Sequence, residues 1–234
     1  MKKVVFGLLV LVVILAAGVG YFYFVARGDT GNRSMKVGAY IRNPEKYPEW
    51  EIHAGETCGD APFQMPTNGF IGFVWDDSFR PGHRHQGLDI FGGTEPGITP
   101  IYAAYDGYLS RLPDWKSTVI IRIPSDPLNP NTQIWTYYTH MADKDGNSSI
   151  ASEFPPNTIE VFVPAGTLLG YQGNFSGTPG NPTGVHLHFS IVKDDGQGKF
   201  LNELEIKNTL DPSPYLGVAV NANENPDDIP VCGK

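Results

Sequence analysis

Glycine and proline set the strongest limit on what this chain can fold into. Its 234 residues include 27 glycines and 20 prolines, about one residue in five, whereas average proteins contain roughly 12% of the two together. Both residues interrupt regular helices, which argues against a helical bundle, a coiled coil or a long helical repeat. Hydrophobic residues make up 41% of the chain and aromatic residues 12%, which is ample for a packed core.

Seven short segments between these turn residues are predicted to be β-strands, because they are rich in β-branched and aromatic residues. They are residues 98–104, 107–112, 117–123, 133–139, 158–163, 167–171 and 185–192. Asp106-Gly107 predicts a hairpin between the first two strands, and residues 164–166 predict a turn between the fifth and the sixth. No stretch beyond the N-terminal region has a convincing helical period. We therefore expect an all-β, antiparallel fold.

The N-terminal region contains a long run without charge. Residues 4–26 include no Asp, Glu, Lys or Arg, and a helix of that length spans about 35 Å, enough to cross the core of a bilayer. Lys2 and Lys3 precede the run, which favours residues 1–3 on the cytoplasmic side. A cleaved signal peptide is the alternative, although its apolar core is usually shorter. We expect a single-pass transmembrane signal anchor at 4–26 in the cell membrane, with the rest of the chain extracytoplasmic.

The remainder of the chain divides by composition. Residues 27–61 are polar and mixed and are predicted to form a membrane-proximal spacer. The strand pattern occupies residues 62–212, which we expect to be one folded domain. Residues 213–234 contain three further prolines and are predicted to form an irregular tail.

The net charge bears on possible partners, and the two cysteines bear on the location of the chain. The formal net charge is −8, and a nucleic-acid-binding protein normally carries a basic patch, so we expect no nucleic-acid partner. Cys58 and Cys232 are the two cysteines. Outside the cytoplasm such a pair is most simply an intramolecular disulfide, which here would fasten the tail to the start of the domain. The alternative is two free thiols.

Two histidines occupy alternate positions in the last predicted strand. The odd-numbered residues from 185 to 191 are all apolar and share one face of a strand, which marks that face as the core side. His186 and His188 therefore project together from the opposite face, about 6–7 Å apart. Two such imidazoles can bind one metal together, or one can bind the metal while the other assists catalysis beside it. The alternative is a chance pair of surface histidines.

Two more candidate groups lie earlier in the chain. His85 and Asp89 are four residues apart, and Gly87 lets the chain bend between them. An imidazole and a carboxylate suit a zinc site with three protein ligands and one open position. His140 follows the aromatic-rich strand 133–139. His53 and His83 are predicted to be ordinary surface residues.

Together and in this order, the three groups resemble the motifs of the lysostaphin-type, or LytM-like, zinc endopeptidases. His85 and Asp89 come first, Tyr-Thr-His-Met at 138–141 second, and His186-Leu187-His188 third. Further passages also match that family, at residues 92–94, 99–104, 106–109, 164–170, 173–177 and 184–189. The resemblance covers roughly residues 68–195.

Two departures from the family pattern are visible. Ser190 stands where the family usually has Glu, a change that we expect not to touch the metal. The loops at 124–133 and 142–162 are longer than in minimal members, and we expect them to border the substrate groove.

The resemblance implies an antiparallel β-sheet peptidase domain with a metal site in a groove. His85, Asp89 and His188 would bind one Zn²⁺ per chain. His140 and His186 would be catalytic, one accepting a proton from water and both stabilising the oxyanion. The implied substrate is a peptide bond in the stem peptides or cross-bridges of peptidoglycan, cut during cell-wall remodelling.

Two other functions remain open at this point. One is a non-hydrolytic family member that acts as a binding scaffold or as an activator of another wall hydrolase. Such proteins have typically lost metal ligands, whereas all five site residues are present here. The other is a membrane-anchored β domain that only binds wall glycan.

Overall fold

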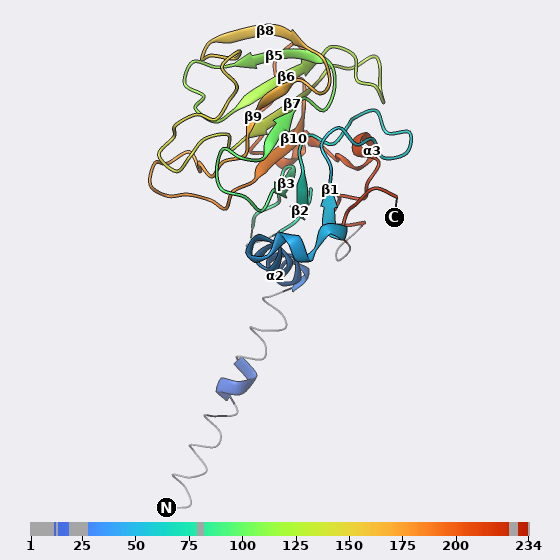
Figure 1. Ribbon diagram of the computed structural model, residues 1–234. Coiled ribbons are helices and arrows are strands. Elements are labelled where there is room, and N and C mark those ends of the chain that lie inside the picture. The colour runs from blue at the N-terminus through green and yellow to red at the C-terminus, as the bar shows by residue number, and fades with distance from the viewer. Residues whose placement is uncertain (1–11, 13, 19–27, 79–81, 225–228, 234) are drawn as a thin grey trace, which may run out of the picture.

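A large antiparallel sheet forms the centre of the molecule (Figure 1). The computed structural model describes residues 12, 14–18, 28–78, 82–224 and 229–233. Within them the sheet has nine strands in the order β1-β2-β3-β10-β7-β6-β5-β8, with β11 beside β10. These strands are β1 (Glu51–Ile52), β2 (Gly69–Phe73), β3 (Leu88–Phe91), β5 (Gly107–Arg111), β6 (Val119–Ile123), β7 (Ile134–Thr139), β8 (Thr158–Val163), β10 (Leu187–Lys193) and β11 (Thr209–Leu210).

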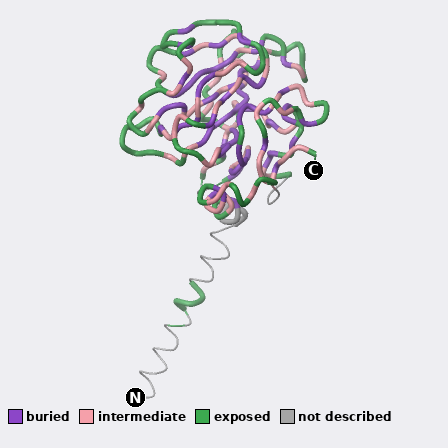
Figure 2. Tube along the Cα trace, viewed as in Figure 1, coloured by how far each residue is buried: buried purple, intermediate pink, exposed green. Residues whose placement is uncertain are grey.

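A smaller sheet and a few short helices complete the described structure. The small sheet pairs β4 (Pro100–Tyr102) with β9 (Leu168–Tyr171). From residue 28 onward the helices are α2 (Gly28–Arg42), η1 (Pro44–Lys46), η2 (Pro48–Trp50), η3 (Ile206–Asn208) and α3 (Ser213–Leu216). Apolar side chains from both sheets form the main core, and the buried residues gather in the middle of the sheet region (Figure 2).

The all-β, antiparallel prediction is confirmed. Each of the seven predicted segments contains a strand, and the strands pair in antiparallel fashion throughout both sheets. The predicted core face of the last strand is also confirmed, because Leu187, Phe189 and Ile191 are fully buried.

The hairpin predicted at Asp106-Gly107 is wrong. β4 pairs with β9, whereas β5 pairs with β6 and β8, so the chain passes from the small sheet to the large one at this point. The Asp106 carboxylate accepts a hydrogen bond from the Ala165 amide at 2.7 Å. A glycine is needed at position 107 because the chain packs closely against β6 there: a Cβ would lie 2.4 Å from a methyl group of Ile121.

The segment predicted to be a spacer is folded against the sheet. α2 packs Val37 and Tyr40 onto Phe70 of β2 and Phe91 of β3. β1 then extends the large sheet by pairing with β2. The helix escaped prediction because its sequence, GDTGNRSMKVGAYIR, contains three glycines and only a narrow apolar stripe. Its stability therefore comes from packing, as is usual for short helices.

A buried ion pair adds to the docking of α2. Arg33 of the helix lies 3.6 Å from Asp77, and both side chains are almost fully buried. Asp77 also accepts the backbone amide of His85 through its own carbonyl, at 2.8 Å. α2 is thus connected to the loop that carries one of the candidate metal ligands.

The C-terminal segment packs on the main core, and after the single turn of α3 its described residues form no further helix or strand. α3 follows Pro212, and Leu216, Val218 and Val220 are buried beside the main core. The predicted disulfide between Cys58 and Cys232 is present, with the two Cα atoms 5.1 Å apart. It closes a loop of 174 residues.

Loss of this disulfide is expected to lower the stability of the domain. Removing a native disulfide that closes a long loop costs about 2–5 kcal/mol, mainly because the unfolded chain gains freedom. The double variant Cys58→Ser/Cys232→Ser should therefore unfold at a lower urea concentration than the parent. A reductant should shift the parent to the same midpoint and leave the variant unchanged. Equal midpoints for oxidised parent and variant would contradict the expectation.

The predicted anchor at residues 4–26 falls mostly outside the described residues. Among the residues that the structure does describe, no helix combines the length and the apolar character needed to cross a bilayer. The transmembrane anchor therefore stays a prediction from the sequence.

Candidate metal centre

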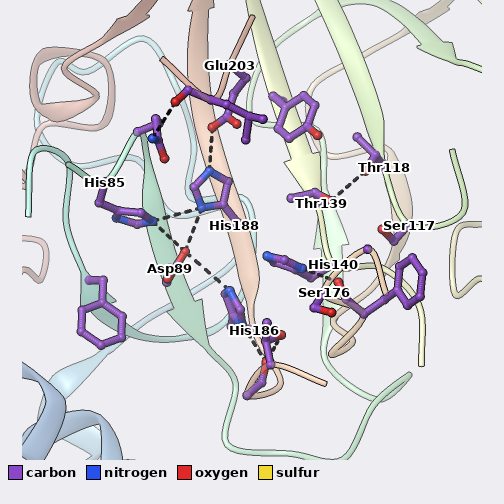
Figure 3. Close-up of a pocket in the computed structure, with 18 of the residues that line it drawn as sticks. His85, Asp89, Ser117, Thr118, Thr139, His140, Ser176, His186, His188 and Glu203 are labelled. Atoms are coloured by element: carbon purple, nitrogen blue, oxygen red, sulfur yellow. Dashed lines mark hydrogen bonds and ion pairs between the residues drawn. The ribbon is translucent and has the colours of Figure 1, made fainter. Parts of the chain in front are cut away.

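The register of three neighbouring strands brings the five predicted site residues together (Figure 3). Asp89 of β3 and His188 of β10 are directly opposite each other. On its other side His188 is opposite Thr139 of β7, the residue before His140. His186 immediately precedes β10, and His85 lies one loop before β3. Sheet pairing thus gathers residues that are up to 103 positions apart.

Three side-chain atoms form a compact donor group at the centre of the site. His85 Nε2 lies 3.0 Å from Asp89 Oδ1 and 3.1 Å from His188 Nδ1. His188 Nδ1 lies 2.9 Å from Asp89 Oδ1. Among the described residues, these three side chains form the group of His, Cys, Asp or Glu that could hold a metal ion.

The donor group fits zinc. Zinc binds imidazole nitrogen and carboxylate oxygen at about 2.0–2.2 Å in a tetrahedral arrangement, which places neighbouring ligand atoms roughly 3.3 Å apart. The three observed separations are near that value. His85 donates its Nδ1 hydrogen to the Val74 carbonyl at 3.0 Å, so its Nε2 lone pair faces the group. Such outer hydrogen bonds fix the ring orientation of a metal-binding histidine.

Charge at the donor group also suits a cation. Burial opposes ionisation of Asp89, but the surrounding His85, His186 and His188 hold the pKa of its carboxyl well below the usual range. Burial lowers the pKa of His188, but Glu203 and Asp89 on either side raise it to about 10. A metal at Nδ1 would displace a proton from this ring, since metal binding requires the deprotonated ligand atom.

His140 stands beside the donor group without belonging to it. Its Nδ1–H donates to the Phe175 carbonyl at 2.6 Å, which leaves Nε2 as an acceptor. Burial, together with the neighbouring His186, lowers the pKa of His140 to about 3, so the ring is neutral at physiological pH. The backbone of His140 has φ +70°, a left-handed conformation that costs about 1–3 kcal/mol in a residue other than glycine.

His186 mirrors this arrangement on the other side of the site. Its Nδ1–H donates to the Gly184 carbonyl at 2.7 Å, and its Nε2 lies 3.5 Å from Asp89 Oδ1. The ring stacks on Phe91, with centroids 5.1 Å apart, and lies 4.5 Å from the His140 ring. Burial lowers the pKa of His186. Two neutral imidazoles therefore offer their Nε2 lone pairs next to the donor group.

The five residues lie in a groove of about 860 Å³. One wall is apolar and contains Val37 and Ile41 of α2. Residues 114–118, 175–177 and 203–204 also line the groove.

Two predictions about the surroundings of the site are wrong. The loop at 124–133 does not border the groove, and its residues line a separate cavity of about 760 Å³ instead. The loop at 142–162 lies behind the groove, with Gly146 against Lys116 and Phe175, which line it. His83, predicted to be an ordinary surface residue, is half-buried and lines the groove, with its ring 6.4 Å from that of His85. His53 is exposed, as expected.

Glu203 is the site residue that the sequence analysis missed. Its Oε1 lies 2.8 Å from Nε2 of His188, and both side chains are almost buried. Burial opposes ionisation of Glu203, but the adjacent His188 holds the pKa of its carboxyl below the usual range. Glu203 lies in a turn after β10, in no recognisable spacing with the other residues. The sole signal was the Ser at position 190, where the family usually has an acidic residue.

Among known proteins, only solved structures show a similarity to this chain. No family model matches the chain, and no curated protein matches it. Lysostaphin from Staphylococcus simulans, an antimicrobial peptidase, is 20% identical with a TM-score of 0.40, over 63% of this chain and 48% of lysostaphin. The chain thus corresponds to about half of that protein.

Two catalytic domains solved on their own match over more of their length. That of lysostaphin is 19% identical with a TM-score of 0.40, over 64% of this chain and 90% of the domain. The catalytic domain of the prophage-encoded M23 protein EnpA from Enterococcus faecalis, solved in a variant form, is 21% identical with a TM-score of 0.36. The match covers 64% of this chain and 94% of that domain. These TM-scores show that the folds overlap only in part. The function of the site is therefore inferred from the geometry and the motifs of this chain. In those motifs the chain resembles the lysostaphin-type peptidases.

Proposed function

We propose that this chain is a zinc-dependent endopeptidase that hydrolyses peptide bonds in peptidoglycan stem peptides or cross-bridges. The observation that carries the proposal is the meeting of the donor group His85, Asp89 and His188 with two neutral histidines in one groove. A metal site alone would suit storage or structure. A metal site flanked by two available proton acceptors suits hydrolysis.

The proposed chemistry divides between the metal and the protein. His85, Asp89 and His188 would hold a zinc ion, which would supply the Lewis acidity needed to polarise a carbonyl and to activate water near neutral pH. One of His140 and His186 would accept the proton of the attacking water at Nε2, the atom that its carbonyl-bound Nδ1–H leaves free. The ring protonated in this way would donate a hydrogen bond to the oxyanion and then pass the same proton to the leaving amine.

The groove is large enough for a peptide on both sides of the metal site. Its volume of about 860 Å³ is at the upper end of the range for sites that enclose a small molecule. Ser117, Thr118 and Ser176 bring hydroxyl groups to one side, where they can bind the backbone of an extended peptide. The peptidoglycan substrate itself is proposed from the motif resemblance.

The proposal also includes a location. Residues 4–26 are long and apolar enough to anchor the chain in the cell membrane, with the β domain on the extracytoplasmic side. The disulfide between Cys58 and Cys232 supports this orientation, because disulfides persist outside the reducing cytoplasm. The enzyme would then act on wall near the membrane, during growth or division.

Digestion of purified peptidoglycan tests this function. The zinc-loaded chain should release peptide fragments whose masses identify one cleaved peptide bond, and chelation of the metal should stop the release. A chain without added peptidoglycan and a chelated chain serve as controls. If the peptidoglycan of several cross-link types stays intact while zinc is bound, the chain is a binding scaffold or activator instead of a hydrolase.

A further inference from the structure

Glu203 contacts the ring nitrogen of His188 that faces away from the donor group. Nδ1 of this ring lies with Asp89 and His85, whereas Nε2 lies 2.8 Å from Glu203 Oε1. Figure 3 shows the carboxylate on one side of the ring and Asp89 on the other. Exposed fractions of 10% and 11% for the His188 and Glu203 side chains leave little room for competing water. We infer that Glu203 is a positioning residue that holds His188 in its metal-binding tautomer.

The physical reason lies in the two nitrogens of a neutral imidazole. One nitrogen carries the hydrogen and the other a lone pair, and the partner of the first decides which is which. A carboxylate only accepts hydrogen bonds, so contact with Glu203 would keep the hydrogen on Nε2 when a metal at Nδ1 displaces the other proton of the ring. The lone pair is then on Nδ1, where it faces Asp89 and His85. The carboxylate also makes the ring a stronger electron donor.

The turn that carries Glu203 is fastened to both ligand-bearing segments. The Leu201 amide donates to the Lys193 carbonyl at the end of β10, at 3.0 Å. Gln86, the neighbour of His85, donates its side-chain amide to the Leu204 carbonyl at 3.0 Å. Glu203 lies between these two attachments. The two attachments therefore hold the backbone at Glu203 in place, and this keeps its carboxylate beside His188.

Close packing around Ser190 explains why the carboxylate that contacts His188 comes from a separate turn and not from β10 itself. Ser190 follows His188 on the same face of β10 and is fully buried. Gly87 comes so close that a Cβ on it would lie 2.8 Å from the Ser190 Cβ and 2.2 Å from the Phe189 carbonyl oxygen. The loop between His85 and Asp89 thus lies directly on β10 at this point. A small side chain fits there, and the acidic partner of His188 comes from residue 203.

Zinc affinity tests this inference, which rests on the proposed zinc centre. Glu203→Ala removes the hydrogen-bond acceptor, and we expect the dissociation constant for zinc, measured against a competing chelator, to rise about 10- to 100-fold. Glu203→Gln keeps an acceptor oxygen without the charge and should lie between Glu203→Ala and the parent. Glu205→Ala is the matched control, because Glu205 is in the same turn, pairs with Lys207 and has a side chain that is about half exposed. Its zinc affinity should equal that of the parent.

A spectroscopic measurement separates positioning from a general loss of structure. In the cobalt-substituted protein, the Nε2 hydrogen of His188 should give a shifted resonance that exchanges slowly with water in the parent and in Glu205→Ala. In Glu203→Ala this resonance should exchange fast, while Glu203→Gln should restore part of the protection. Equal zinc affinity and equal exchange in Glu203→Ala and Glu205→Ala would overturn the role of Glu203 and leave the zinc centre standing. A parent chain that binds no zinc would overturn both.

Discussion

Replacing His188 by alanine is expected to remove both the bound zinc and the hydrolytic activity. His188 supplies one of three donor atoms that lie about 3 Å apart, and its loss leaves two ligands around the metal. The remaining Asp89 also loses its contact with the His188 ring, which lies 2.9 Å from its Oδ1. Because a catalytic metal supplies several kcal/mol of transition-state stabilisation, hydrolysis should slow by about 10³-fold or more.

Zinc per chain, measured by elemental mass spectrometry after dialysis, and the hydrolysis rate together check this expectation. His53→Ala is the matched control, because His53 is exposed and lies outside the groove. It should keep one zinc per chain and the full rate. A His188→Ala variant that still carries stoichiometric zinc would show that His188 is not a ligand.

Replacing His140 should give a different result, with activity lost and zinc retained. The ring of His140 is fixed by the Phe175 carbonyl and lies outside the donor group. Loss of a residue that transfers a proton slows a reaction by about 10²- to 10⁴-fold. The zinc dissociation constant should stay within about threefold of the parent value, since no donor atom has been removed.

The backbone of His140 calls for a second variant. Alanine is strained at a φ of +70°, whereas asparagine tolerates the left-handed region. His140→Asn therefore removes the imidazole with little backbone strain, and it should match His140→Ala in lost activity while being more stable. If both variants also lose zinc, the division between metal ligands and catalytic residues is wrong.

Local alternation in the sequence was enough to predict the part of the site carried by β10. Because strand residues alternate between two faces, the apolar residues 187, 189 and 191 fixed the core side and placed His186 and His188 together. The separate roles of these two histidines did not follow from alternation. In the structure they differ because His188 faces Asp89 across a strand pair, while His186 precedes the strand.

Features that depend on contacts remote in sequence could not be predicted. α2 has a weak helical pattern and is stabilised by Phe70, Phe91 and Asp77, which lie 30 or more residues further along the chain. The pairing of β4 with β9 overrides the local signal at Asp106-Gly107. Glu203 reaches His188 through a turn whose attachments are tertiary. In each case the decisive interaction joins segments that no local motif connects.

Zinc content of the purified chain tests the central claim most directly, namely that His85, Asp89 and His188 form a metal centre. The metal-free chain should be loaded with zinc, dialysed to remove loosely bound ion and measured by elemental mass spectrometry. The account predicts one zinc per chain, and none in an otherwise folded Asp89→Ala variant treated in the same way. A folded parent chain that retains no stoichiometric zinc after loading would contradict the account.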